Sequence, residues 1–173
     1  MLDAEAPTFA LVQPSVLRRE WQLRTGDGVK AVLRLPAFRS GGRAEAAGRP
    51  FRIERHGSLR AEYAVRDEAT GEEVARLRRD GRRSVLQLEG RQAEWKRLGR
   101  KEGYGFVGTD GVPLVRARVR SGLFHSGGEV QFEPALDEQA AVVAALLASY
   151  LLIRKNEEEA AAATAATTAA TGP

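Results

Sequence analysis

Residues 137–155 read DEQAAVVAALLASYLLIRK. From Ala140 to Ile153 this stretch contains only Ala, Val, Leu and Ile, apart from one Ser and one Tyr. A helix with this composition has no polar face, so it must be covered on every side. The stretch therefore predicts either a helix buried in a protein core or a segment that crosses a membrane.

The length of the apolar run favours the buried helix. Its residues span roughly 21 Å at a helical rise of about 1.5 Å per residue. The hydrocarbon layer of a bilayer is about 30 Å thick and needs about 20 apolar residues. We therefore expect no transmembrane segment, and a tail anchor is the alternative.

Polar residues mark both ends of the expected helix. Asp137 is placed to accept N–H bonds as the N-cap, and Glu138 lies in the positively charged first turn. Arg154 and Lys155 lie in the negatively charged last turn, and Asn156 can end the helix. We therefore expect the central helix to comprise residues 137–155.

In the chain before the helix, turn-forming residues recur at the spacing that is typical of an all-β protein. Turn signals recur about every eight to twelve residues, which predicts about eleven or twelve short antiparallel strands. The turn signals lie at 25–28, 67–71, 80–81 and 109–111. The expected strands are 8–13, 17–24, 29–35, 50–55, 59–65, 72–79, 83–89, 91–97, 103–108, 115–120 and 129–133.

Apolar and polar side chains alternate in several of these strands, which places one face in the core and the other in water. The inward face of 29–35 consists of Val29, Ala31, Leu33 and Leu35. The strand 115–120 has Val115, Ala117 and Val119 inside and Arg116, Arg118 and Arg120 outside.

Two segments lack such a pattern. Residues 37–49 are rich in Gly, and we expect them to form a mobile loop. Residues 157–173 have nothing to bury beyond one further helical turn, and we expect a disordered Ala/Thr-rich tail. Residues 1–156 then form a single domain.

A sheet of about twelve one-sided strands would leave its edges and an apolar face uncovered. Closing the sheet removes the edges, but the interior is then too wide for its own side chains to fill. A helix about 10 Å across fits that interior. We therefore predict a mainly β protein, a closed antiparallel β-barrel of about 12 strands that encloses the C-terminal apolar α-helix.

The composition limits the chemistry. The chain of 173 residues has no Cys, so disulfides and thiolate metal sites are excluded. Its start has neither the basic nor the apolar region of a secretory signal, and we expect a cytoplasmic location, peripheral at the inner membrane surface if a lipid is bound. A formal net charge of +4 favours anionic partners.

Three features occur in a fixed order before and within the helix. They are Trp95 in a strand, the hairpin GFVGTDGVPLVRARVR of 105–120, and GGEVQFEPALDEQAAVVAALLASYLLIRK of 127–155. This order resembles the tubby C-terminal-like superfamily, which includes tubby domains, LURP-one-related proteins and phospholipid scramblases. The last feature is similar to the way LURP-one-related proteins and scramblases pass from their last strand through an Asp into a central helix.

The resemblance implies a barrel around a central helix and, in several members, no enzymatic activity. Tubby domains bind phosphoinositides through surface Lys and Arg, and scramblases move phospholipids in response to calcium bound by an acidic segment before the helix. Residues 123–133 here read LFHSGGEVQFE, and Glu129 and Glu133 lack the clustered oxygen ligands that calcium needs. We expect no metal site and no cofactor.

No catalytic constellation is visible in the sequence. The spacing G-x-G-x-x-G occurs at 103–108, but dinucleotide binding requires a helix directly after it, and here a turn and another strand follow. His56 and His125 lie far apart, without an acid or nucleophile at a recognised spacing. We therefore expect that the protein is not an enzyme. The alternative is an enzyme whose active site cannot be recognised from a single sequence.

Three basic clusters point to a ligand. They are Arg76, Arg78, Arg79, Arg82 and Arg83 around the Asp80-Gly81 turn; Lys96, Arg97, Arg100 and Lys101 after Trp95; and the ladder Arg116, Arg118 and Arg120. Arginines two apart on a strand project side by side, about 7 Å apart, so several can hold one phosphate group. The interpretation that the clusters favour by themselves is nevertheless a solvated exterior on which Arg pairs with Glu across strands.

These clusters predict an anionic ligand, and the resemblance to the tubby C-terminal-like superfamily implies that the ligand is an anionic phospholipid headgroup at a membrane surface, bound by a non-enzymatic module. The candidate ligand-binding residues are Arg116, Arg118, Arg120, Arg76, Arg78 and Arg79. A protein partner, nucleic acid and scramblase-like phospholipid transfer remain alternatives. Nucleic acid is less favoured because Trp95 is the only aromatic residue near these clusters that bases can stack on.

Overall fold

The computed structural model describes residues 7–15, 17–37, 40–57, 61–99, 101–121, 126–134 and 136–170, without the side chains of 119–121, 126 and 166–170. These residues form twelve β-strands and one α-helix, α1 (Glu138–Ala170). The strands are β1 (Thr8–Val12), β2 (Glu20–Thr25), β3 (Gly28–Arg34), β4 (Gly42–Ala46), β5 (Arg49–His56), β6 (Glu62–Asp67), β7 (Glu73–Asp80), β8 (Arg83–Leu88), β9 (Arg91–Gly99), β10 (Gly103–Gly108), β11 (Pro113–Ser121) and β12 (Ser126–Phe132).

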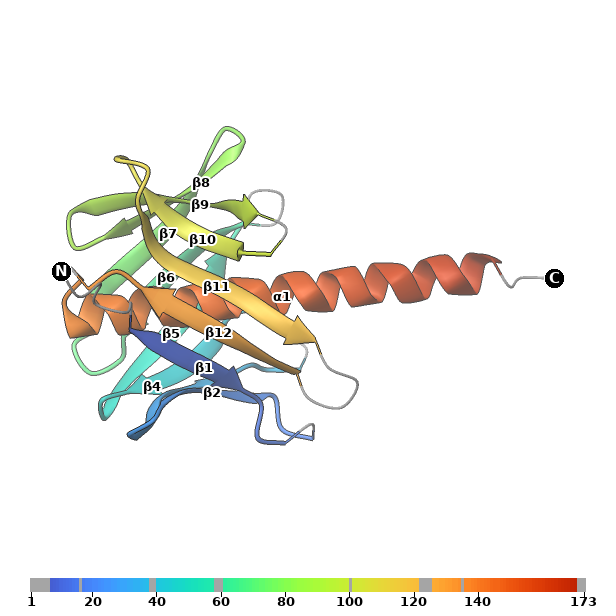
Figure 1. The fold of residues 1–173 in the computed structure, drawn as a ribbon, viewed down its shortest axis with the longest axis horizontal. Coiled ribbons are helices and arrows are strands. Elements are labelled where there is room, and N and C mark those ends of the chain that lie inside the picture. The colour runs from blue at the N-terminus through green and yellow to red at the C-terminus, as the bar shows by residue number, and fades with distance from the viewer. Residues whose placement is uncertain are drawn as a thin grey trace.

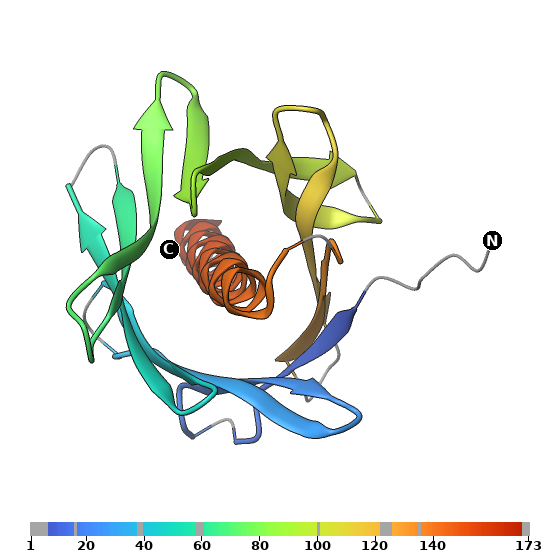
Figure 2. The same ribbon diagram turned by 90° about the vertical axis from the view of Figure 1, so that its left-hand side faces the viewer.

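The twelve strands form a closed barrel. Each strand pairs antiparallel with the next strand in the chain, and β1 pairs with β12 (Figures 1 and 2). The closing pair places Phe9 opposite Val130 and Leu11 opposite Gly128. The prediction of a closed antiparallel barrel of twelve strands is confirmed.

Helix α1 passes through the barrel (Figure 2). Between Ala140 and Ile153 its side chains are buried, apart from those of Val142 and Leu151, which are partly buried, and Leu146 and Leu147 are 0% exposed. Asp137 caps the helix, because its carboxylate accepts a hydrogen bond from the N–H of Ala140 at 2.9 Å. A hydrogen bond with Glu89, followed by the one from Ala140, keeps the pKa of Asp137 below its ordinary value. The predicted start of the central helix is confirmed.

The end of the helix differs from the prediction. Helix α1 continues past Asn156 to Ala170 and projects beyond the barrel, through the segment expected to be disordered (Figure 1). Ala and Glu are strong helix formers, so this segment needs no buried face to favour helix. Ion pairs within the helix add support, at 3.1 Å between Arg154 and Glu157 and at 2.6 Å between Lys155 and Glu159.

The expected loop at 37–49 also differs, because it contains strand β4. This strand pairs with both β3 and β5. Its inward residues Gly42, Ala44 and Ala46 are buried, whereas Arg43 and Glu45 are exposed. The alternation is therefore present, but it is carried by the smallest side chains, which have little β-propensity.

The inward face predicted for residues 29–35 is confirmed except at Val29. Ala31, Leu33 and Leu35 are buried, but Val29 is 45% exposed. Leu23 of β2 pairs with Ala31 and Arg24 pairs with Val29, so Lys30 has no opposite residue and forms a bulge. A bulge interrupts the alternation of side chains, which explains why Val29 leaves the core.

The described residues contain no helix with an apolar run long enough to cross a membrane. The strand expected at 59–65 begins at Glu62 in the structure, and Leu59 lies outside the described residues. Arg100 and His125 also lie outside them.

Substitution of a central helix residue should be costly. Leu147→Ala should lower the free energy of unfolding by about 2 to 5 kcal/mol, because it leaves a cavity where the side chain packs inside the barrel. Chemical denaturation measures this loss. Glu158→Ala, on the exposed part of the same helix, is the control and should change the free energy by less than about 0.5 kcal/mol.

Two truncations test the role of the helix. Deletion of residues 137–173 should leave a molten or insoluble chain, because the interior would be an unfilled apolar cavity. Deletion of residues 158–173 should barely change the melting temperature, since residues 158–165 are exposed. Circular dichroism melts and gel filtration measure both outcomes. A chain without 137–173 that stays monomeric and melts cooperatively would contradict this architecture.

Candidate functional site

The arginine ladder on β11 is matched to glutamates. Arg118 lies 2.6 Å from Glu129 of β12, which faces it across the strand pair. Arg116 lies 3.5 Å from Glu102. The side chain of Arg120 lies outside the described part of the structure. Both described members of the ladder therefore already have an anionic partner.

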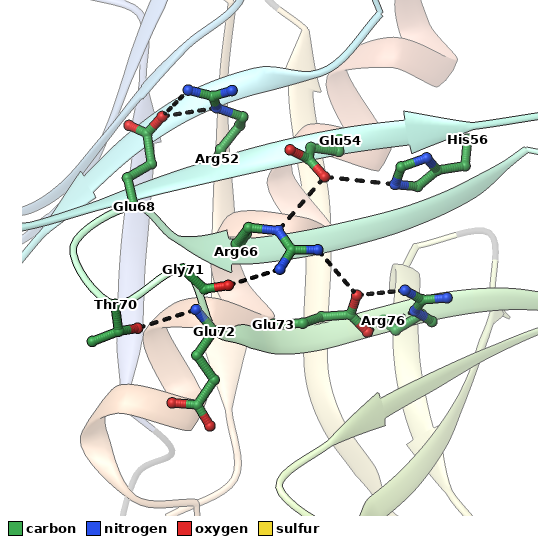
Figure 3. A network of polar contacts seen from close by, with 10 residues as sticks. All are labelled: Arg52, Glu54, His56, Arg66, Glu68, Thr70, Gly71, Glu72, Glu73 and Arg76. Atoms are coloured by element: carbon green, nitrogen blue, oxygen red, sulfur yellow. Dashed lines mark hydrogen bonds and ion pairs between the residues drawn. The ribbon is translucent and has the colours of Figure 1, made fainter.

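Arg76 also belongs to a network of ion pairs, on the exterior of β5, β6 and β7 (Figure 3). It donates to both carboxylate oxygens of Glu73, at 2.6 and 2.5 Å. Glu73 also faces Arg66, which in turn lies 3.8 Å from Glu54. Opposite charges alternate across this surface, as expected for a solvated barrel exterior.

The turn between β7 and β8 has the opposite character. Arg78, Arg79, Arg82 and Arg83 are all exposed there, and Asp80 is the one carboxylate among them. No ion pair joins these four arginines to any carboxylate of the described residues. Arg79 donates only a long hydrogen bond, 3.4 Å, to the carbonyl of Gly81. We call these four arginines the hairpin cluster.

The hairpin cluster lies on a projection of the barrel (Figures 1 and 2). Strands β7 and β8 remain paired to Asp80 and Arg83, whereas β8 and β9 are paired only as far as Val85 and Glu94. Beyond that point the hairpin separates from β9, which carries the exposed residues Lys96 and Arg97. The hairpin tip can therefore approach an extended surface ahead of the barrel wall.

The predicted site residues therefore divide into two classes. Arg76, Arg116 and Arg118 are paired with glutamates, and Arg78 and Arg79 are not. The sequence could not separate these classes, because the partner of an exterior arginine depends on strand register. In contrast, the sequence does contain the cue for the hairpin cluster, since four arginines surround one aspartate there.

The glycines at 103–108 serve the barrel. They lie in β10, followed by a turn and β11 rather than by a helix. A Cβ atom on Gly103 would lie 2.4 Å from the carbonyl oxygen of Ala117, and one on Gly105 would lie 2.4 Å from that of Val115. Only glycine permits such close approach of β11. His56 is exposed and lies 3.6 Å from Glu54.

Asp67 is a buried charge that the sequence marks only as part of a turn. Its carboxylate accepts hydrogen bonds from the N–H of Ala69, at 2.8 Å, and from the guanidinium group of Arg49. Burial raises the pKa of Asp67, but these two donors outweigh it, so the pKa lies below its ordinary value. Arg49 also donates to Gln139, at 2.5 Å, and so connects the barrel wall to the start of α1.

Comparison with protein-family models, with curated proteins and with solved structures gives no match to this chain. The arrangement of a twelve-stranded closed barrel with a C-terminal helix is established by the structure itself.

Because the pKa of Asp67 is lowered in the folded state, we expect the protein to lose stability in acid. A carboxyl group whose pKa is lower in the folded state than in the unfolded state stabilises the fold. This stabilisation is fully present above the pKa of the unfolded state, about 3.9, and is lost as the pH falls through the lower pKa of the folded state. Asp67→Asn should lower the melting temperature at neutral pH and flatten its decline in acid. Asp27→Asn, in the exposed turn between β2 and β3, should do neither. Thermal melts at several pH values measure both variants.

Calcium should not stabilise the protein. Among the described residues no three potential metal ligands gather, and Glu129 pairs with Arg118. A ligand raises the melting temperature only by binding the native state, so millimolar calcium should leave the melting temperature unchanged. Differential scanning calorimetry with calcium or with a chelator measures the effect. A clear rise with calcium would favour the scramblase-like alternative.

Proposed function

We propose that this protein is a non-enzymatic module that binds anionic phospholipid headgroups at a membrane surface through the hairpin cluster. The proposal rests on one observation. Arg78, Arg79, Arg82 and Arg83 gather at one projecting turn without ion pairs to the described residues, whereas the described arginines of the ladder are paired. The architecture resembles the tubby C-terminal-like superfamily, whose tubby domains bind phosphoinositides.

The free arginines are better suited to phosphate than the paired ones. A guanidinium group presents a planar fork of donors that matches two phosphate oxygens. Arg118 would have to give up its contact with Glu129 before it could bind a phosphate. The hairpin arginines have no carboxylate within ion-pair distance among the described residues, so the hairpin cluster keeps more of its attraction for an anionic surface than the ladder does.

The same structure favours lipid over single-stranded nucleic acid. Strand-binding sites combine cations with aromatic rings on which bases stack. Trp95 is half-buried and already packs on Tyr104 and Phe106, with ring centroids 5.8 and 4.8 Å away. Its rings are engaged within the barrel, and the hairpin cluster itself contains no aromatic residue.

Liposome co-sedimentation tests the proposal. The variant R78Q/R79Q/R82Q should lose roughly 3 kcal/mol of attraction to anionic vesicles, because each cation near such a surface contributes about 1 kcal/mol. This is on the order of a hundredfold in partitioning. The wild-type binding should also weaken as salt rises, because surface charges are screened beyond about 8 Å at physiological ionic strength.

The ladder variant R116Q/R118Q/R120Q is the matched control, since it removes the same number of charges. It should lose less binding than the hairpin variant, because Arg116 and Arg118 are partly neutralised by glutamates. Thermal melts verify that both variants fold. Equal loss in the two variants, or no binding of wild type to anionic vesicles, would refute the hairpin as the site. If the wild-type protein binds duplex or single-stranded DNA more tightly than anionic vesicles, its ligand is nucleic acid and not lipid.

A further inference from the structure

A cleft of about 890 Å³ opens at the end of the barrel where α1 begins. Figure 2 looks toward this end of the molecule. Val142 and Val143 of the helix line one side of the cleft, and Phe9, Phe51 and Phe132 line the barrel side. Ligand sites in proteins occupy about 300 to 1,000 Å³ and occur often in the mouths of β-barrels. The cleft is thus of the right size and in the right place for a small molecule.

The cleft lies between the first turns of helix α1 and the wall formed by strands β1, β3, β4, β5 and β12. Helix α1 packs most closely against β11, and it approaches β12 and β3 to a similar extent and β4 less. The inward residues of β3 and β4 at the cleft are Ala31 and Ala46, whose small side chains fill less of the space beside the helix than larger residues would. Val142 is consequently only partly buried although its neighbours on the helix are covered.

Charged residues surround the mouth of the cleft, and all of them except Lys30 and Glu138 have an ion-pair partner among the described residues. Arg34 pairs with Glu20 at 3.0 Å, and Arg49 pairs with Asp67. Lys30 makes no ion pair or hydrogen bond with the other described side chains. Since Lys30 is the bulged residue of β3 and lines the cleft, its ammonium group is the cation available to a ligand there.

A second polar group in the cleft wall lacks a partner. The hydroxyl oxygen of Thr25 is buried and has no hydrogen-bond partner among the described residues. Buried polar atoms are nearly always hydrogen-bonded, so an orphan in the wall of a cleft indicates a missing partner. Thr25 precedes the turn that leads to Lys30, which places both groups at the same end of the cleft.

We infer that this cleft binds a small amphiphilic carboxylic acid, such as a medium-chain fatty acid. The hydrocarbon chain lies against Phe9, Phe51 and Val142, and the carboxylate lies at Lys30. An apolar floor with one unpaired cation at its rim complements this class of molecule, whereas a neutral hydrocarbon would leave Lys30 unused. The site is separate from the hairpin cluster, which lies on β7 and β8.

Sodium decanoate, below its micelle-forming concentration, is the probe. Decanoate should raise the melting temperature of the wild-type protein and give a saturable heat in titration calorimetry. Butyrate has the carboxylate without the chain, and decanol has the chain without the charge, so both should bind at least about tenfold more weakly. No saturable binding of decanoate, or equal binding of decanol, would overturn the inference.

Two variants locate the site. Val142→Phe places a larger side chain in the cleft and should abolish decanoate binding, while Lys30→Gln should weaken it about tenfold, through loss of the charged partner. If Val142→Phe fails to fold, Lys30→Gln alone decides the outcome. Unchanged binding in Lys30→Gln would overturn the site. R78Q/R79Q/R82Q should bind decanoate like the wild type, so that the lipid-surface proposal can fail independently.

Discussion

The structure depends on one constraint, which is that the apolar surface of α1 must be covered on every side. A single sheet face covers only one side of a helix, and a closed sheet covers all of them. A twelve-stranded barrel has an interior wide enough for a helix of about 10 Å. The inward alternation of the strands, the closure by β1 and β12, and the small residues of β4 all follow from this requirement.

The same constraint leaves recognition to the surface and the ends. The helix occupies the lumen, so polar chemistry is confined to the barrel exterior and to the openings around α1. Several described arginines there pair with glutamates of the same strand, a neighbouring strand or an adjoining turn, which lowers the local net charge. Two places stand out from this pattern: the β7–β8 turn, where four arginines without ion pairs to the described residues gather, and the mouth at Lys30, which opens into a cleft. Recognition is proposed at these two places because they depart from the general pattern.

The sequence predicts those features that depend on local contrast between apolar and polar residues. The uniform apolar run at 140–153 and its Asp137 cap identify the helix, and strong alternation identifies most strands. The sequence does not predict strand β4, because its inward Gly and Ala residues contrast little with polar residues. It does not predict the exposure of Val29, because a bulge shifts the alternation of side chains there. The helix end at Ala170 depends on propensity rather than burial. Whether an exterior arginine is ion-paired depends on strand register. Arg118, for example, faces Glu129 only when β11 and β12 are aligned as observed.

The position of α1 at the end of the chain has a consequence for biosynthesis. Eleven of the twelve strand pairings join consecutive strands, so they can form as the chain emerges from the ribosome. The twelfth joins the two ends of the sheet, and the helix that fills the barrel is translated after all twelve strands. Until then the newborn chain presents a curved sheet with a bare apolar face. Such long-range closure is slow, and the waiting intermediate is the form of this protein most in need of a chaperone.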